Sequence, residues 1–222
     1  MGGNIKKLFY FLFLLFINLL LNFQTVFSQC GAGDTSPMWV KALTGTNYTV
    51  AWDGISTGLH FTRDIYGTPL PTSEVESIIR ASIDNAIEVW TAAANNQGHI
   101  LSMTQVTDPS FANIKVQFTN SGSPEDYGDA LGSLINIASQ HTWTDDPNLI
   151  TNYPDLYTIM VHEMGHIFLG AGHAANTSKS VMYYSNLQVK RKLTYCDLTT
   201  TLNFYNPYYT VTVKNSFGVL VL

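Results

Sequence analysis

The chain has 222 residues, with 11 lysine and arginine residues against 16 aspartate and glutamate residues. Its formal net charge is −5 at pH 7, and only 12% of its residues are charged. This acidic balance leaves no basic patch for nucleic acid, so we expect no nucleic-acid partner. The low charge content suits the neutral surface of an extracellular protein.

The N-terminus has the features of a secretory signal peptide. Lys6 and Lys7 precede an apolar run over residues 8–21, and Ser28 offers a small residue for signal peptidase. We therefore expect residues 1–28 to be removed and the protein to be secreted. The alternative is a retained membrane anchor, because the apolar run is long enough to be marginal. N-terminal sequencing separates the two.

The chain that follows has about 194 residues, which suits one well-packed domain. Without Lys6 and Lys7 it holds 9 basic against 16 acidic residues. We expect a monomer with no stable membrane partner. A segment at residues 29–38, which is a possible pro-segment, precedes the main domain at 39–206, and a tail covers 207–222.

The first half of the domain predicts a strand at residues 59–62 and then a long helix at 73–94. Ser73 and Glu76 have the spacing of a capping box at the start of this helix. Apolar residues recur along it at helical spacing, which predicts a core-facing stripe. The stripe consists of Val75, Ile79, Ile83, Ala86, Ile87 and Trp90.

Further segments alternate as half-buried strands do, and they lie at 100–106, 113–118 and 134–138. A loop rich in serine, glycine, proline and aspartate is expected at 120–132. A last helix is expected at about 194–205, with Thr194 and Asp197 forming a second capping box. Residues 211–213 and 219–222 are candidate terminal strands.

A further helix is predicted after Pro154, with Asp155 as its N-cap. This helix leads into the sequence HEMGHIFLGAGH at 162–173. Two histidines four apart lie on one face of a helix, so His162 and His166 can reach one zinc ion. The adjacent Glu163 can take a proton from a zinc-bound water. Glycines end the helix, so His173 can return to the same ion.

This segment resembles the zinc signature of the metzincin metallopeptidases, HExxHxxGxxH followed by a methionine-containing turn. The resemblance implies that His162, His166 and His173 bind zinc and that Glu163 is the general base. It also implies that Met182 forms a hydrophobic floor beneath the metal. In the family pattern the third histidine lies six residues after the second, whereas here His173 lies seven residues after His166.

The additional residue falls before Gly170, and one residue rotates an ideal helix end by about 100°. A helix bulge or a longer turn, eased by glycine, would absorb it. If His173 does not return to the metal, His141 and Asp197 are the other candidate ligands. The rival function is then a catalytically impaired zinc- or protein-binding module derived from a metallopeptidase.

The order of elements is similar to the matrixin branch of the metzincins over residues 39–205. The resemblance implies an α+β fold: a twisted, mostly parallel sheet with an antiparallel edge strand, a long backing helix, a zinc-site helix and a C-terminal helix. In that branch the edge strand pairs with extended substrate, and by position residues 135–139 are expected to be that strand.

The two cysteines, Cys30 and Cys196, are expected to form a disulfide because the chain is expected to be secreted. The alternative comes from a resemblance: CGAGD at 30–34 is similar to the core of the cysteine switch that caps zinc in matrix metallopeptidase pro-segments. Asp34 is a second candidate for that latency role.

Two further features follow from the resemblance. Matrixins carry structural metal sites before the zinc helix, and a calcium site here would use oxygen ligands from Asp126, Asp129, Asp145 and Asp146. The alternative is a solvated acidic loop. Tyr184 lies where astacins and serralysins carry a tyrosine that contacts the zinc or the oxyanion; the alternative is an ordinary packed tyrosine.

Together these features predict a secreted zinc endopeptidase that acts on protein or peptide substrates. Zinc lowers the pKa of a bound water to about 7. Glu163 would take the proton as that water attacks the scissile carbonyl, and then pass it to the leaving amine.

Overall fold

The structure is a computed structural model of the chain. It describes residues 46–54, 58–96, 101–120, 126–169, 173, 180–183, 189–194, 197, 213–214 and 220–221. Among these, no helix is both long and apolar enough to cross a membrane.

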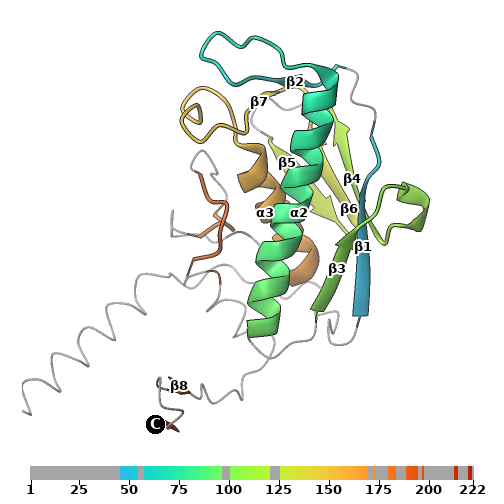
Figure 1. The fold of residues 1–222 in the computed structure, drawn as a ribbon, viewed down its shortest axis with the longest axis vertical. Helices are drawn as coiled ribbons and strands as arrows, with labels where there is room; N and C mark the ends of the chain where they lie inside the picture. Colours follow the sequence, from blue (N-terminus) through green and yellow to red (C-terminus); the bar gives the residue numbers. More distant parts are fainter. Residues whose placement is uncertain are drawn as a thin grey trace, which may run out of the picture.

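A five-stranded sheet forms the frame of the domain (Figure 1). Its strands are β1 (Thr46–Trp52), β3 (Leu101–Gln105), β4 (Ile114–Thr119), β5 (Gly128–Leu131) and β6 (Leu134–Ala138). The spatial order is β3-β1-β4-β6-β5. The first four strands of this order run parallel, and β5 runs antiparallel to β6 at one edge. This is the sheet that the α+β expectation described.

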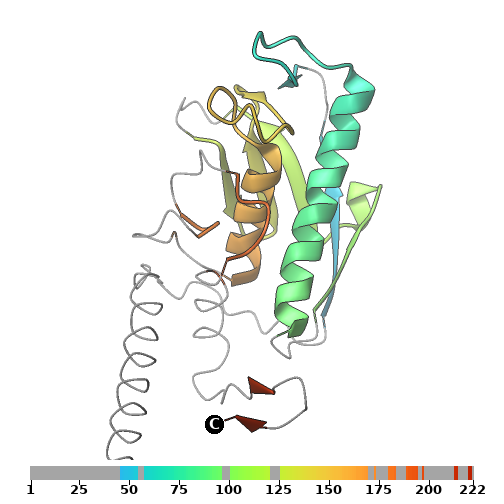
Figure 2. The ribbon, with the colours of Figure 1, turned by 60° about the vertical axis from the view of Figure 1, so that its left-hand side comes forward.

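Two helices, α2 (Thr72–Asn96) and α3 (Leu156–Leu169), pack against each other and against this sheet (Figures 1 and 2). Helix α2 contacts β1 and β3, while α3 contacts β5 and β6. The zinc-signature helix is thus held beside the antiparallel edge of the sheet, and α2 backs it along its length.

The core lies between the helices and the sheet. Every residue of the predicted stripe on α2 is buried, which confirms that this face packs inward. Ile114 and Val116 of β4 and Ile135 and Ile137 of β6 alternate inward to meet it. Full burial of each such side chain contributes about 1.5–3 kcal/mol to stability. The core therefore fixes the position of α3.

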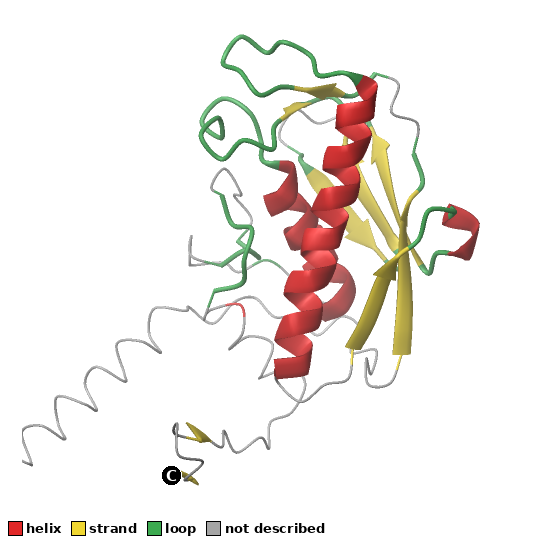
Figure 3. Cartoon of the chain, viewed as in Figure 1, coloured by secondary structure: helices red, strands yellow, loops and turns green. Residues whose placement is uncertain are grey.

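Smaller elements complete the described fold. Strands β2 (His60–Phe61) and β7 (Thr142–Trp143) pair in parallel, and η1 (Pro109–Phe111) follows β3. The loops that follow β2 and β7 lie at the same end of the domain (Figure 3). Short strands β8 (Val213–Lys214) and β9 (Leu220–Val221) pair antiparallel, within or beside the predicted terminal strands.

The strand predicted at 59–62 is confirmed as β2, but it is not the first strand, because β1 precedes it. The first half of β1 is polar and its last three residues are all buried, so β1 lacks clear alternation. Two other predictions were wrong. The predicted loop at 120–132 contains β5. The expected edge strand at 135–139 lies inside the sheet, because β6 pairs with β4 on one side and β5 on the other. The free edge belongs to β5.

Candidate metal and catalytic site

The zinc-signature helix begins with a charged cap. Asp155 accepts hydrogen bonds from the backbone N–H of Thr158 at 3.0 Å and from its hydroxyl at 2.6 Å, which confirms the predicted N-cap. Asp155 is only 2% exposed and forms an ion pair with Arg191. The start of α3 is therefore fixed by a buried charge pair as well as by the core.

The structure brings the three predicted ligands together. His162, His166 and His173 each offer a ring nitrogen, and these atoms lie within 4.8 Å of one another. The Nε2 atoms of His162 and His166 are 3.1 Å apart. Helix α3 continues through Leu169, and the residues between it and His173 lie outside the described part of the chain.

The His162 ring is held in one orientation. Its Nδ1 lies 2.6 Å from the carbonyl oxygen of Val181 and donates a hydrogen bond to it, so Nε2 is the unprotonated nitrogen of the neutral ring. Burial, together with the neighbouring His166, lowers the pKa of His162 to about 3. The ring is therefore neutral at pH 7, which is the state in which imidazole binds a metal.

Glu163 lies beside the cluster in an apolar environment. It is only 4% exposed, and its Oε2 has no hydrogen-bond partner among the described residues. Burial raises its pKa to about 8, and the Asp129 carboxylate on β5 adds to the shift. A buried carboxyl with an unpartnered oxygen destabilises the fold, and such a group in a native structure indicates a functional role.

Strand β5 lies directly over this carboxyl. A Cβ atom on Gly128 would lie 3.0 Å from Glu163 Oε1 and 3.1 Å from its Cγ, which is tighter than ordinary contact. Glycine at this position thus lets the edge strand approach the glutamate. The sequence did not predict this contact, because residues 120–132 were expected to form a loop.

The predicted methionine turn packs beneath the histidines. A Cβ on Gly165, which lies three residues after His162 on the same face of α3, would come within 2.5 Å of Met182 Sδ and 2.7 Å of Trp90 Cζ2. The Trp90 indole N–H also donates to the Val161 carbonyl at 2.8 Å. Met182 therefore has the position expected of a hydrophobic floor, and α2 helps to hold it there.

Asp197 holds the methionine turn. One of its oxygens accepts from the Ser180 hydroxyl at 2.5 Å and from the Val181 N–H at 2.9 Å. The other accepts from the Thr194 N–H at 2.7 Å, which is the backbone bond of the predicted capping box. Asp197 is not one of the three clustered residues, so the structure gives this reserve ligand a supporting position instead.

Lys190 is a second support that sequence analysis missed. The residue is 8% exposed, and its ammonium group donates to the Ser180 carbonyl at 2.8 Å. Its backbone N–H donates to the Thr158 hydroxyl at 2.8 Å. This one residue therefore links the start of α3 to the methionine turn. Lys190 is the first residue of the basic run KRK at 190–192, and nothing in that run marks it as a buried residue.

The other reserve ligand, His141, lies apart from the cluster. Its Nε2 is 2.7 Å from the Asp126 carbonyl, and its ring packs on Tyr127 at a centroid distance of 4.7 Å. The histidine cluster is the one group of three or more metal-ligating side chains among the described residues.

The aspartates considered for calcium have other contacts. Asp145 pairs with Arg63 at 2.7 Å, and Asp146 accepts from the Asn148 N–H at 2.9 Å. Asp129 lies on β5 near Glu163. Calcium binding stays a prediction.

Several predicted residues lie outside the described part of the chain. They are Tyr184, Cys30, Cys196, Asp34 and most of the expected C-terminal helix. The catalytic role of Tyr184, the disulfide and the latency role stay predictions.

The donor set fits a zinc ion. Zinc–nitrogen bonds of 2.0–2.1 Å in a tetrahedral arrangement separate two ligand nitrogens by about 3.3 Å. The His162–His166 separation of 3.1 Å is close to that value. The three imidazole rings are also close together, with centroid separations of 4.8, 5.1 and 4.9 Å.

Comparison with known proteins agrees with this geometry. The family model for matrixin, a class of metallopeptidases, matches residues 60–206, which is more than half of the chain. The chain therefore belongs to the matrixin family of zinc metallopeptidases.

Among solved structures, the chain is similar to myroilysin, with 14% sequence identity and a TM-score of 0.39. The match covers 77% of this chain and 98% of that one. No curated protein matches.

Proposed function

We propose that this protein is a secreted zinc endopeptidase in which His162, His166 and His173 hold the metal and Glu163 is the general base. The observation that carries the proposal is the three-histidine cluster, with a buried, unpartnered carboxyl on the adjacent residue. Three protein ligands suit a catalytic zinc site, since such sites keep a fourth position open.

When bound, zinc supplies Lewis acidity for a carbonyl and lowers the pKa of water. Glu163 takes the proton from the attacking water and passes it to the leaving amine. Burial raises the pKa of Glu163, which makes its carboxylate a stronger base than an exposed one. The Val181 carbonyl favours the His162 tautomer in which Nε2 is unprotonated and can bind a metal.

Strand β5 is the proposed docking edge for substrate. Its far side has no strand partner in the described sheet, so an extended peptide can pair with it. Gly128 lies against Glu163, so a peptide bond aligned along β5 would lie near the general base. This moves the substrate-pairing role from the predicted residues 135–139 to 128–131.

The rival function, an impaired binding module, depended on loss of the third ligand. The presence of His173 in the cluster supports the peptidase over this rival. Metal analysis with a casein or gelatin assay on the chain from residue 29 tests the proposal. We expect one zinc per chain and cleavage that a chelator stops. A zinc-loaded chain that cleaves neither substrate supports the rival.

Secretion is proposed from the N-terminal segment alone. N-terminal sequencing of protein recovered from culture medium tests it. We expect the sequence to begin at Gln29, and an intact Met1 in a membrane fraction contradicts the proposal.

A further inference from the structure

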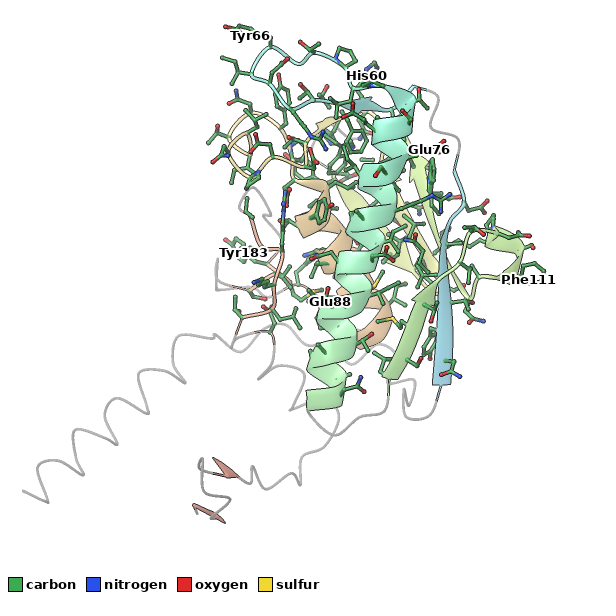
Figure 4. The ribbon with its side chains drawn as sticks, in the orientation of Figure 1. His60, Tyr66, Glu76, Glu88, Phe111 and Tyr183 are labelled. Atoms are coloured by element: carbon green, nitrogen blue, oxygen red, sulfur yellow. The ribbon has the colours of Figure 1, made fainter. Side chains whose placement is uncertain are left out.

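A polar cavity of about 520 Å³ lies where β1 ends, and no residue of the histidine cluster lines it. Glu76 marks it in Figure 4, on the side of α2 that faces β1, whereas Tyr183 of the methionine turn lies on the opposite side. The cavity is lined by Trp52, Asp53, Gly54, Glu76, Arg80, Thr107 and Pro109. Arg80 is ten residues before Trp90, or about 15 Å along α2.

The Trp52 indole is the first sign of a ligand. Its side chain is only 6% exposed, yet its Nε1 has no hydrogen-bond partner among the described residues. The other described tryptophans are satisfied: Trp90 Nε1 donates to a carbonyl at 2.8 Å and Trp143 Nε1 does so at 2.9 Å. A buried donor without an acceptor costs about 1–3 kcal/mol. The indole of Trp52 therefore calls for an acceptor.

Arg80 supplies a second donor in the same position. Its Nη1 is buried and has no partner among the described residues, and its guanidinium carbon lies 5.6 Å from the centroid of the Trp52 ring. An arginine that is not paired with a carboxylate attracts one, because the planar guanidinium forms charge-assisted hydrogen bonds. The guanidinium lies over the indole ring, and both residues line the same cavity, so an anionic ligand bound there would have two donors to contact.

Gly54 packs directly against the Trp52 indole. A Cβ at this position would lie 2.3 Å from Trp52 Nε1 and 3.1 Å from its Cδ1, where no atom can be tolerated. Any larger residue at position 54 would therefore displace the indole from its place in the cavity lining.

The opposite charge is also present in the cavity. Glu76 lies one helical turn before Arg80 and forms no ion pair with a described residue. Asp53 is already paired with Lys115 at 3.3 Å. Glu76 is therefore the carboxylate available to a ligand cation.

We propose that this cavity binds a small carboxylate, held by the Arg80 guanidinium and the Trp52 indole N–H. Glu76 selects carboxylates that also carry an ammonium group, as free α-amino acids do. The site does not involve the histidine cluster, so its test does not depend on proteolytic activity.

The indole N–H signals of 15N-labelled full chain test the proposal, because each tryptophan reports separately. Probes are glycine, N-acetylglycine, acetate, methylammonium and inorganic phosphate, titrated to about 10 mM, which captures binding free energies of about 3 kcal/mol. We expect glycine to shift the Trp52 signal while those of Trp90 and Trp143 stay unchanged. N-acetylglycine stands in for a peptide C-terminus and distinguishes that source from a free amino acid.

Three variants sharpen the test, and Lys192→Gln is the charge-matched control on an exposed residue. Arg80→Gln should weaken carboxylate binding about tenfold or more, which is the loss of one hydrogen bond to a charged group. Glu76→Gln should reduce glycine to the affinity of acetate, and Gly54→Ala should block both. A Trp52 signal that responds to no carboxylate, or to phosphate alone, overturns the proposal; equal affinity for glycine and acetate in the unmodified chain overturns the role of Glu76.

Discussion

Gly165→Ala is the substitution that most directly probes how the methionine turn supports the histidines. Gly165 lies in the middle of α3, where alanine would normally be favoured by about 1 kcal/mol. Here the new methyl group would lie 2.5 Å from Met182 Sδ and 2.7 Å from Trp90 Cζ2. Both atoms would have to move for the helix to keep its place.

The expected cost follows from how freely each neighbour can move. The Trp90 ring is tied to α3 by its bond to Val161, so it cannot retreat without losing that bond. Met182 is flexible, but its displacement also shifts the neighbouring Val181 carbonyl that orients His162. Overpacking of this kind costs about 1–3 kcal/mol. After the gain of about 1 kcal/mol in helix propensity, we expect a net loss of up to about 2 kcal/mol.

Urea unfolding of the zinc-free protein measures this loss, and competition with a chelator measures the accompanying loss of zinc affinity. The matched control is Gly165→Ala in a Met182→Ala background, where the methyl group has room. There the penalty should shrink or vanish. If Gly165→Ala alone stabilises the protein by about 1 kcal/mol, as helix propensity would dictate, the close packing described for the turn is wrong.

Three further substitutions test neighbouring parts of the site. Trp90→Phe removes the donor to the buried Val161 carbonyl and should cost about 1–3 kcal/mol by urea unfolding, whereas an unchanged midpoint would show that this bond contributes nothing. Asp197→Asn keeps the shape but weakens bonds to the methionine turn, so zinc should dissociate faster under chelator competition; an unchanged rate would mean that Asp197 does not support the metal site. Glu163→Gln tests the buried carboxyl in zinc-free protein. The folded pKa of about 8 lies above the carboxyl's ordinary pKa of 4.5, so the folded state binds the extra proton, and wild-type stability falls as pH rises between these values. The variant should therefore gain up to about 4 kcal/mol relative to wild type from pH 4.5 to 8, and parallel pH profiles would refute the shift.

The zinc helix and α2 could be predicted from the sequence because their signals are local. The spacing of His162 and His166 and the cap at Asp155 each lie within one helical segment. The apolar stripe of α2 likewise repeats at a fixed period, and every one of its predicted residues is buried. Patterns of this kind depend on helix geometry alone.

The errors concern contacts between distant segments. Strand β5 contains Gly128 and Asp129, which favour loops in isolation, and it becomes a strand because β6 offers it a partner. The contact of Asp197 with Ser180 joins residues far apart in the chain, and no local spacing predicts it. The return of His173 likewise depends on how the chain turns after α3, which the motif spacing alone left open.

In the proposed mechanism, Glu163 performs the proton transfer at a metal site formed by His162, His166 and His173. The direct measurement is kcat/KM for casein cleavage by wild type and Glu163→Ala, each at a confirmed content of one zinc per chain. We expect the variant to keep its zinc and to lose at least about 100-fold in kcat/KM. A zinc-loaded variant that cleaves casein at close to the wild-type rate would contradict it.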